Sequence, residues 1–191
     1  MMSSNEFRLT ADNARLCLQT VADNGFVLTL PVLLWNGLLT RKLPGLFAAA
    51  VFHRDVPAAI RVPENIFRVL VLVLPGFTAL GGVTEHRSGY LLYLAGLAVY
   101  FLSWLCLISF PQSRWSRSLT GVVAPALTPG FWLVGIGLVS SPYLEGWTWF
   151  RPVYFCGVFV FLAAHCLHVW FIHRRESSRQ VAGRTSPDRE V

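Results

Sequence analysis

The sequence carries little charge. Of its 191 residues, 14% are charged and 54% are hydrophobic, whereas a soluble globular protein has about 25% charged residues. This composition excludes an ordinary soluble domain, so the first partner that we expect is a lipid bilayer. The net charge of +6 falls in short loops and near the C-terminal end. It is not gathered in one patch, so we expect no nucleic-acid partner.

Cysteine motifs and the signatures of common enzymes are also missing. The four cysteines stand singly, and without CxxC or CxxCH there is no zinc ribbon, thioredoxin motif or c-type haem site. The sequence has no GxSxG, P-loop, GxGxxG or HExxH motif. It therefore identifies neither catalytic residues nor a cofactor.

The N-terminal segment lacks the features of a signal peptide, because acidic residues interrupt it and it has no basic start or apolar core. Apolar residues from Phe7 to Val21 recur at helical spacing, with charged residues on the other face. We predict that residues 1–24 form an amphipathic helix. Such a helix either lies in the membrane interface or docks on the rest of the protein.

The sequence predicts an all-α integral membrane protein in which residues 25–173 form a bundle of about five transmembrane helices. The central segment, Ser118–Ser141, has no charge but contains two prolines and four glycines. Proline frees a backbone carbonyl within a spanning helix, so we predict a break in its first half. The other four expected spans are Phe26–Thr40, Glu64–Val83, Gly89–Phe110 and Pro152–His173. Pro63 and Glu64 suit the first turn of their helix.

Two apolar segments are short for a bilayer. At ~1.5 Å per residue, Phe26–Thr40 reaches about 23 Å, while a hydrocarbon core is ~30 Å thick. This span must begin earlier or cross a thinned region. Leu43–Phe52 is too short to span, which predicts an interfacial or re-entrant segment.

Basic residues divide unevenly between the two sides of a five-span layout. One side holds Arg41, Lys42, Arg54, Arg61, Arg114, Arg117 and the arginines of residues 174–191. The other side holds Arg8, Arg15, Arg87 and Arg151. By the positive-inside rule, the protein lies in the cytoplasmic (inner) membrane with its N-terminus out and its C-terminus in. Residues 174–191 are predicted to be a basic, disordered cytoplasmic tail.

Polar residues within the expected spans fall in the cytoplasmic half. Because ionisable groups in a membrane usually face a bundle interior or a wet cavity, we predict a polar pocket open to the cytoplasm. Its lining is predicted to be Asn36, Glu64, Arg68, Thr128, His165 and His168. Purely structural roles are open to the same residues. An ion pair can mark a helix start, and an amide or a neutral histidine can hold two helices together.

His165 and His168 also raise the question of a metal. At a spacing of three residues they share one helix face, so they could bind one metal ion together. His53 or Glu64 would be the third ligand. The two histidines cannot bind one haem axially, because axial ligands approach from opposite faces. A b-type haem would therefore need a dimer or a partner protein.

Three functional hypotheses follow. The first is a binding or accessory protein for a small amphiphile, such as a lipid or a quinone headgroup, or for a larger membrane complex. The second is a membrane enzyme or a metal- or haem-binding redox protein that uses His165 and His168. The third is a small carrier, which is weakened because no internal repeat or inverted pair of broken segments is found. A homo-oligomer stays open in each case.

Reporter fusions test the predicted orientation. A reporter fused after residue 191 is expected to be active in the cytoplasm, and a tag placed before residue 5 is expected to be accessible from outside. Both ends reporting the same side would show that a span has been miscounted, with Phe26–Thr40 and Leu43–Phe52 the first segments to suspect.

Overall fold

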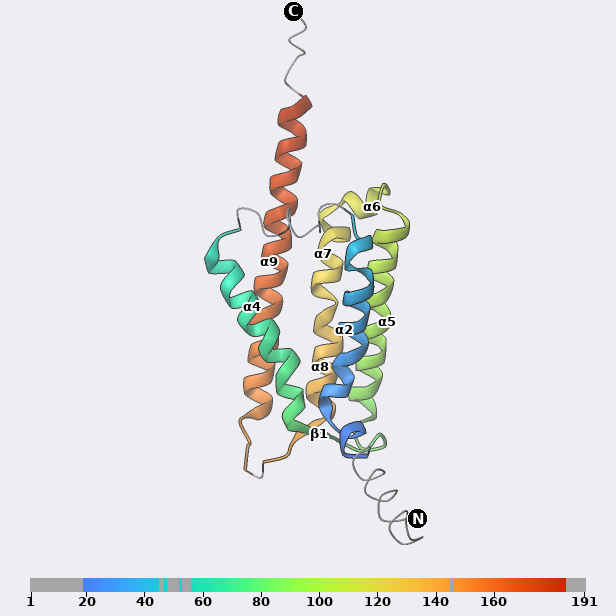
Figure 1. Ribbon diagram of the computed structural model, residues 1–191, viewed down its shortest axis with the longest axis vertical. Coiled ribbons are helices and arrows are strands. Elements are labelled where there is room, and N and C mark those ends of the chain that lie inside the picture. The colour runs from blue at the N-terminus through green and yellow to red at the C-terminus, as the bar shows by residue number, and fades with distance from the viewer. Residues whose placement is uncertain (1–18, 45–46, 48–51, 53–55, 145, 185–191) are drawn as a thin grey trace, which may run out of the picture.

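The structure of the chain is a computed structural model that describes residues 19–44, 47, 52, 56–144 and 146–184. It is mostly helical, and its long helices lie side by side in alternating directions (Figure 1). The helices are α2 (Leu30–Leu39), α4 (Ala58–Val73), α5 (Arg87–Ser109), α6 (Arg114–Arg117), α7 (Leu119–Leu127), α8 (Pro129–Val139) and α9 (Phe150–Arg184). The prediction of a mostly helical protein is therefore confirmed.

Three helical segments in the described ranges are long and apolar enough to cross a membrane. They are Arg87–Ser109, Leu119–Val139 and Phe150–Ser178, which match the third, fourth and fifth predicted spans. The sequence predicted five spans, and the structure gives three such candidates. The first two predicted spans fall short because α2 has 10 residues and α4 has 16.

Prolines account for the two short helices. Pro31 is the second residue of α2, which follows the 3-10 helix Gly25–Thr29. Pro75 lies just beyond the end of α4, within the 3-10 helix Leu74–Phe77. A proline has no N–H to donate to the helical hydrogen-bond ladder, so regular α-helix begins or ends near each of them.

Helix α4 begins earlier than predicted. It starts at Ala58, directly after Pro57, so Pro63 lies inside the helix. The prediction that Pro63 occupies the first helical position was wrong, because the helix already begins after Pro57, its N-cap residue. Glu64 consequently lies beyond the first turn, where it is buried.

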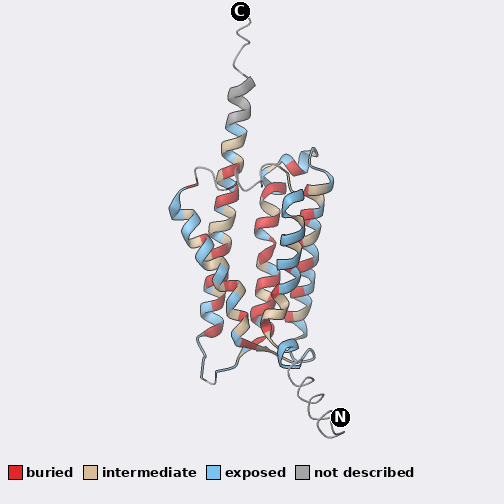
Figure 2. Ribbon diagram, in the orientation of Figure 1, coloured by how far each residue is buried: buried red, intermediate tan, exposed pale blue. Residues whose placement is uncertain are grey.

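The predicted break in the central segment is confirmed. Helices α7 and α8 meet at Thr128, with Pro129 as the first residue of α8. The apolar stretch of this segment is 61% buried, whereas those of the other two candidate spans are 39% and 33% buried. Figure 2 shows the same concentration of buried residues along α7 and α8. The broken helix is therefore the centre of the bundle.

Glycines bring two pairs of helices into close contact. A Cβ atom at Gly96 of α5 would lie 2.5 Å from the backbone nitrogen of Trp132 in α8. At Gly135 of α8 it would lie 2.6 Å from the backbone nitrogen of Tyr93. On the other side of the bundle, a Cβ at Gly157 of α9 would lie 2.8 Å from the Leu70 side chain of α4. The bundle is therefore built from an α5–α8 pair and an α4–α9 pair.

Tyrosine hydroxyls hold α2 and the preceding 3-10 helix, Gly25–Thr29, against α5. Tyr93 donates to the main-chain oxygen of Leu28 at 2.8 Å, and Tyr100 donates to Oδ1 of Asn36 at 2.6 Å. The rings of Trp35 and Phe101 stack between the same helices, with centroids 4.2 Å apart.

A small sheet ties the end of the bundle opposite α6. Strand β1 (Thr78–Leu80) pairs antiparallel with β2 (Ser140–Pro142), with Ala79 opposite Ser141. Asn24 forms an isolated bridge with Ala79, and its side chain donates to the main-chain oxygen of Gly76 at 2.9 Å. The sequence analysis did not predict this sheet.

Helix α9 extends beyond residue 174, where the sequence predicted a disordered tail, and ends at Arg184. A helix that already exists adds residues readily, and arginine, glutamate and alanine favour helix. The Ser177 and Ser178 hydroxyls bond back to main-chain oxygens one turn earlier. Of the amphipathic helix predicted for residues 1–24, the described part is helical at 19–22. Most of Leu43–Phe52 lies outside the described residues.

Alanine substitutions test the helix contact at Gly96. Gly96→Ala is expected to destabilise the protein by about 1–3 kcal/mol, because the added methyl group meets backbone that cannot move freely. Gly37→Ala is the matched control, since nothing lies within 4 Å of the added atom and alanine favours helix. Thermal unfolding in lipid nanodiscs measures both. Equal stability of the two variants would show that α5 and α8 are not in close contact.

Candidate functional site

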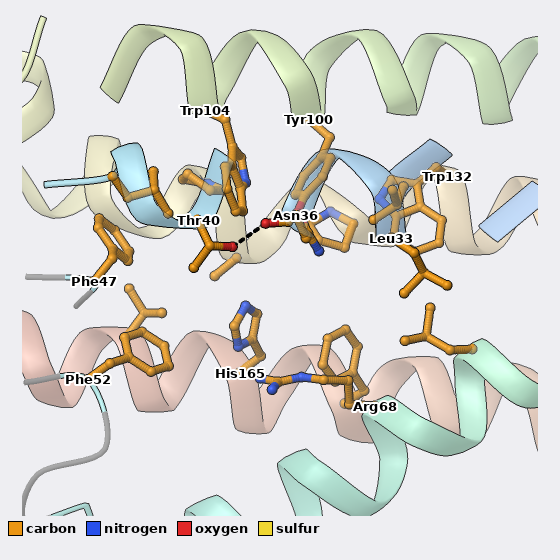
Figure 3. A pocket seen from close by; sticks show the side chains of 18 of the residues that line it. Leu33, Asn36, Thr40, Phe47, Phe52, Arg68, Tyr100, Trp104, Trp132 and His165 are labelled. Atoms are coloured by element: carbon orange, nitrogen blue, oxygen red, sulfur yellow. Dashed lines mark hydrogen bonds between the residues drawn. The ribbon is translucent and has the colours of Figure 1, made fainter. Parts of the chain in front are cut away.

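A cavity of about 320 Å³ lies inside the bundle, within the size range of ligand pockets. Its walls come from α2, α4, α5, α7, α8 and α9, so it lies where α2 and the two helix pairs meet (Figure 3). Aromatic rings make up much of the lining: Phe47, Phe52, Tyr100, Trp104, Trp132 and Phe161.

The polar groups of the lining come from facing walls. Asn36, Thr40 and Tyr100 lie on one side, and His165 and Arg68 lie on the other (Figure 3). Oδ1 of Asn36 accepts the Tyr100 hydroxyl, and the Thr40 hydroxyl donates to the main-chain oxygen of Asn36. The polar groups of α2 are thereby fixed in position at the cavity.

The Glu64 carboxylate lies behind Arg68 and His165 and joins α4 to α9. Its side chain is 1% exposed. Oε1 accepts from Arg68, one turn further along α4, and lies 2.9 Å from Nδ1 of His165. Oε2 contacts Nδ1 of His168. One carboxylate is therefore shared by three basic side chains, two of them on the neighbouring helix.

His168 is fully buried between two oxygen atoms. Its Nδ1 faces the Glu64 carboxylate, and its Nε2 lies 2.8 Å from the main-chain oxygen of Phe52. A carbonyl oxygen and an ionised carboxylate only accept hydrogen bonds. If Glu64 is ionised beside Arg68, a hydrogen on each ring nitrogen of His168 would satisfy both oxygen atoms.

The six residues predicted to line the pocket occupy three kinds of position. Asn36, Arg68 and His165 line the cavity. Glu64 and His168 lie behind Arg68 and His165 and contact them through the shared carboxylate. Thr128 lies at the break between α7 and α8, beside the lining residue Pro129, with its hydroxyl buried and without a hydrogen-bond partner among the described residues.

Both histidines face Glu64 through Nδ1. Across the described ranges, no group of three or more His, Cys, Asp or Glu side chains could hold a metal ion. Both ring nitrogens of His168 already have protein partners, and Nδ1 of His165 bonds Glu64. His53, the other third ligand considered, lies outside the described residues.

The predicted lining did not include the tryptophans of the pocket. Trp104 and Trp132 line the cavity, and their indole nitrogens are buried without a hydrogen-bond partner in the described part of the chain. Their rings resemble ordinary packing residues of an apolar span, so spacing alone gives no signal. The available signal was chemical, because each indole brings an N–H group into the interior.

Comparison of the chain with known protein families, with curated proteins and with solved structures gave no match in any of the three. The function therefore has to be argued from the chemistry of the pocket itself.

Loss of the Glu64 charge is expected to destabilise the protein. Glu64→Gln keeps the size of the side chain but leaves Arg68 and His168 without their carboxylate, which typically costs about 3–5 kcal/mol for a buried pair. Glu85→Gln removes a charge from an exposed loop residue and is expected to change stability by less than about 0.5 kcal/mol. Thermal unfolding in nanodiscs compares the two.

A double variant tests whether Glu64 and His168 stabilise one another directly. If Glu64 and His168 interact directly, Glu64→Gln combined with His168→Gln should cost less than the two single changes added together, by about 0.5–3 kcal/mol. Strict additivity would show that the two side chains do not stabilise one another.

Proposed function

We propose that this is a multi-pass membrane protein that binds a small amphiphile in the interior cavity, acting as a binding or accessory protein. One observation carries the proposal: a cavity with aromatic walls and a few fixed polar groups lies inside a helical bundle whose outer surface is apolar. Such a cavity suits a ligand with an apolar body and a small polar head.

The outer surface supports the membrane setting. Large apolar side chains are exposed on α2, α4, α5 and α9, among them Leu34, Leu38, Val69, Leu94, Leu102 and Phe159. Exposed apolar area on this scale is unusual for a soluble monomer and marks contact with lipid or with another protein. Lipid is the simpler partner, because the exposed residues lie on helices around the bundle (Figure 2).

Five crossings remain the proposed topology. Gly25–Thr29, α2 and Thr40–Lys42 form one helical run, and α4 continues directly into Leu74–Phe77. Because a 3-10 helix rises ~2.0 Å per residue and an α-helix ~1.5 Å, these runs reach about 31 and 32 Å. Both lengths match a hydrocarbon core of ~30 Å, and both runs lie beside the three long helices (Figure 1).

The distribution of basic residues supports an orientation. Arg41 and Lys42 follow α2, and Arg114 and Arg117 lie on α6, at the same end from which α9 projects (Figure 1). By the positive-inside rule this end faces the cytoplasm. The protein is thus proposed to lie in the inner membrane with its N-terminus out and its C-terminus in.

The cavity is placed to receive its ligand from the bilayer. Leu33 of α2 lines the cavity and is 39% exposed, and its neighbour Leu34, which is not in the lining, is 65% exposed. One rim of the cavity therefore reaches the apolar outer surface beside α2. An amphiphile could enter there with its polar head leading and leave its tail among the lipids.

The redox alternative has less support, because both ring nitrogens of His168 and Nδ1 of His165 are bonded to Glu64 or Phe52, which leaves Nε2 of His165 as the one histidine nitrogen of this cluster without a partner among the described residues. A carrier would need two alternating openings. The sequence shows no internal repeat of the kind from which such carriers are commonly built.

Filling the rim tests the proposed function. Decanol, decanoate and a decyl-substituted benzoquinone are each titrated into the protein in nanodiscs of neutral phospholipid, and bound copies are counted by native mass spectrometry. At least one of the three is expected to bind saturably as a single copy. Leu33→Trp, which adds bulk at the rim, should weaken that binding by about tenfold or more.

Leu34→Trp is the matched control, because Leu34 is 65% exposed and does not line the cavity. Equal binding by both variants, or no saturable binding of any probe to the unmodified protein, would show that the cavity is not an amphiphile site.

A further inference from the structure

Two buried hydrogen-bond donors in the cavity wall lack partners. The indole nitrogens of Trp104 and Trp132 make no well-formed hydrogen bond to any described residue, although the Trp104 indole lies beside the Tyr100 hydroxyl and both side chains are more than nine-tenths buried. Leaving a buried donor unsatisfied costs about 1–3 kcal/mol, so each such group calls for an explanation. A bound ligand with acceptor atoms would explain both indoles, because both tryptophans line the cavity.

Two further side chains of the lining, Asn36 and Arg68, also have N–H groups. Oδ1 of Asn36 is occupied by the Tyr100 hydroxyl, and the Asn36 amide nitrogen makes no hydrogen bond within the described part of the chain. Arg68 has only donors, and its guanidinium belongs to the lining. The lining therefore contains several N–H groups without a partner among the described residues, which favours a ligand head that accepts hydrogen bonds.

The donors are spread around the cavity. The Tyr100 ring lies between the two indoles, with its centroid 5.8 Å from that of Trp104 and 6.3 Å from that of Trp132. Arg68 lies on the facing wall (Figure 3). A single carboxylate or phosphate is best bound by donors that converge on one point. Donors at separate points suit a head with oxygen atoms at opposite edges.

The charge and shape of the walls narrow the ligand further. Arg68 is already paired with Glu64, so an anionic head would have to compete with a buried carboxylate. The aromatic rings of the lining offer flat faces on which a planar ring can stack. A cavity of about 320 Å³ has room for on the order of ten water-sized groups of ~30 Å³ each, enough for one substituted six-membered ring.

We infer that the amphiphile is a quinone: a neutral, planar ring with two carbonyl oxygens at opposite edges and an apolar tail. This inference rests on the proposed function. The carbonyl oxygens accept from the indole N–H groups of Trp104 and Trp132 and from the Asn36 amide. The ring packs among the aromatic side chains, and the tail leaves beside Leu33. The inference concerns binding and involves no electron transfer.

A series of probes that share one tail tests the class of ligand. The decyl-substituted benzoquinone is compared with decylbenzene, which lacks acceptors, and with decanoate, which is an anion, in nanodiscs of neutral phospholipid. The quinone is expected to bind at least tenfold more tightly than either. Equal binding of decylbenzene, or tighter binding of decanoate, overturns the inference while leaving the proposed amphiphile site intact. Binding of none of the probes rejects both.

Variants that remove one N–H group at a time test the contacts. Trp104→Phe and Trp132→Phe are each expected to weaken quinone binding about three- to tenfold, the usual effect of one lost hydrogen bond. Binding of decylbenzene to the same variants should be unchanged. Trp149→Phe is the control, because Trp149 is 72% exposed and lies outside the cavity.

An isosteric replacement keeps this test valid if phenylalanine disturbs the fold. Benzothienylalanine at position 104 or 132 has nearly the shape of tryptophan but no N–H group. The same three- to tenfold loss is expected with unchanged thermal stability of the ligand-free protein. Unaltered quinone affinity in both isosteric proteins would contradict the assigned hydrogen bonds.

Discussion

The buried carboxylate of Glu64 is the contact on which the rest of the arrangement depends. It lies on α4 and bonds both histidines of α9, so it fixes the rotation of each helix about its own axis. An ionised group in this setting is costly unless it is paired, and here Arg68 supplies a compensating charge while both histidine rings bond the carboxylate. That pairing in turn places Arg68 and His165 in the cavity wall, where they become available to a ligand.

The two halves of the bundle are built by different physical means, and the cavity lies where they meet. Close backbone contact at Gly96 and Gly135 joins α5 to α8, whereas α4 and α9 are joined by the Glu64 cluster as well as by packing at Gly157. Helix α2 and the 3-10 helix before it are held by one tyrosine hydroxyl each. A helix attached by a few side-chain bonds is well suited to border a cavity, because it can be positioned without filling the space beside it.

Sequence reasoning succeeded where one strong constraint acts alone. Long uncharged runs identified three spans, and paired prolines identified the break at Thr128. The cost of ionisable groups in a membrane drew attention to Glu64 and the histidines. It could not predict which of them would face the cavity, because that depends on helix rotation. The ends of α4 and α9, the β1–β2 pair and the tryptophan donors depend on tertiary contacts that spacing does not encode.

The protonation of His168 is the most direct measure of the Glu64 cluster. Nitrogen-15 NMR of the histidine-labelled protein in nanodiscs at neutral pH resolves the two ring nitrogens, with His168→Gln providing the assignment. The geometry predicts that both nitrogens of His168 are protonated and exchange slowly with water, because each N–H is bonded to a buried oxygen. A His168 ring with one unprotonated nitrogen would contradict the proposed role of Glu64 as the ionised link between α4 and α9.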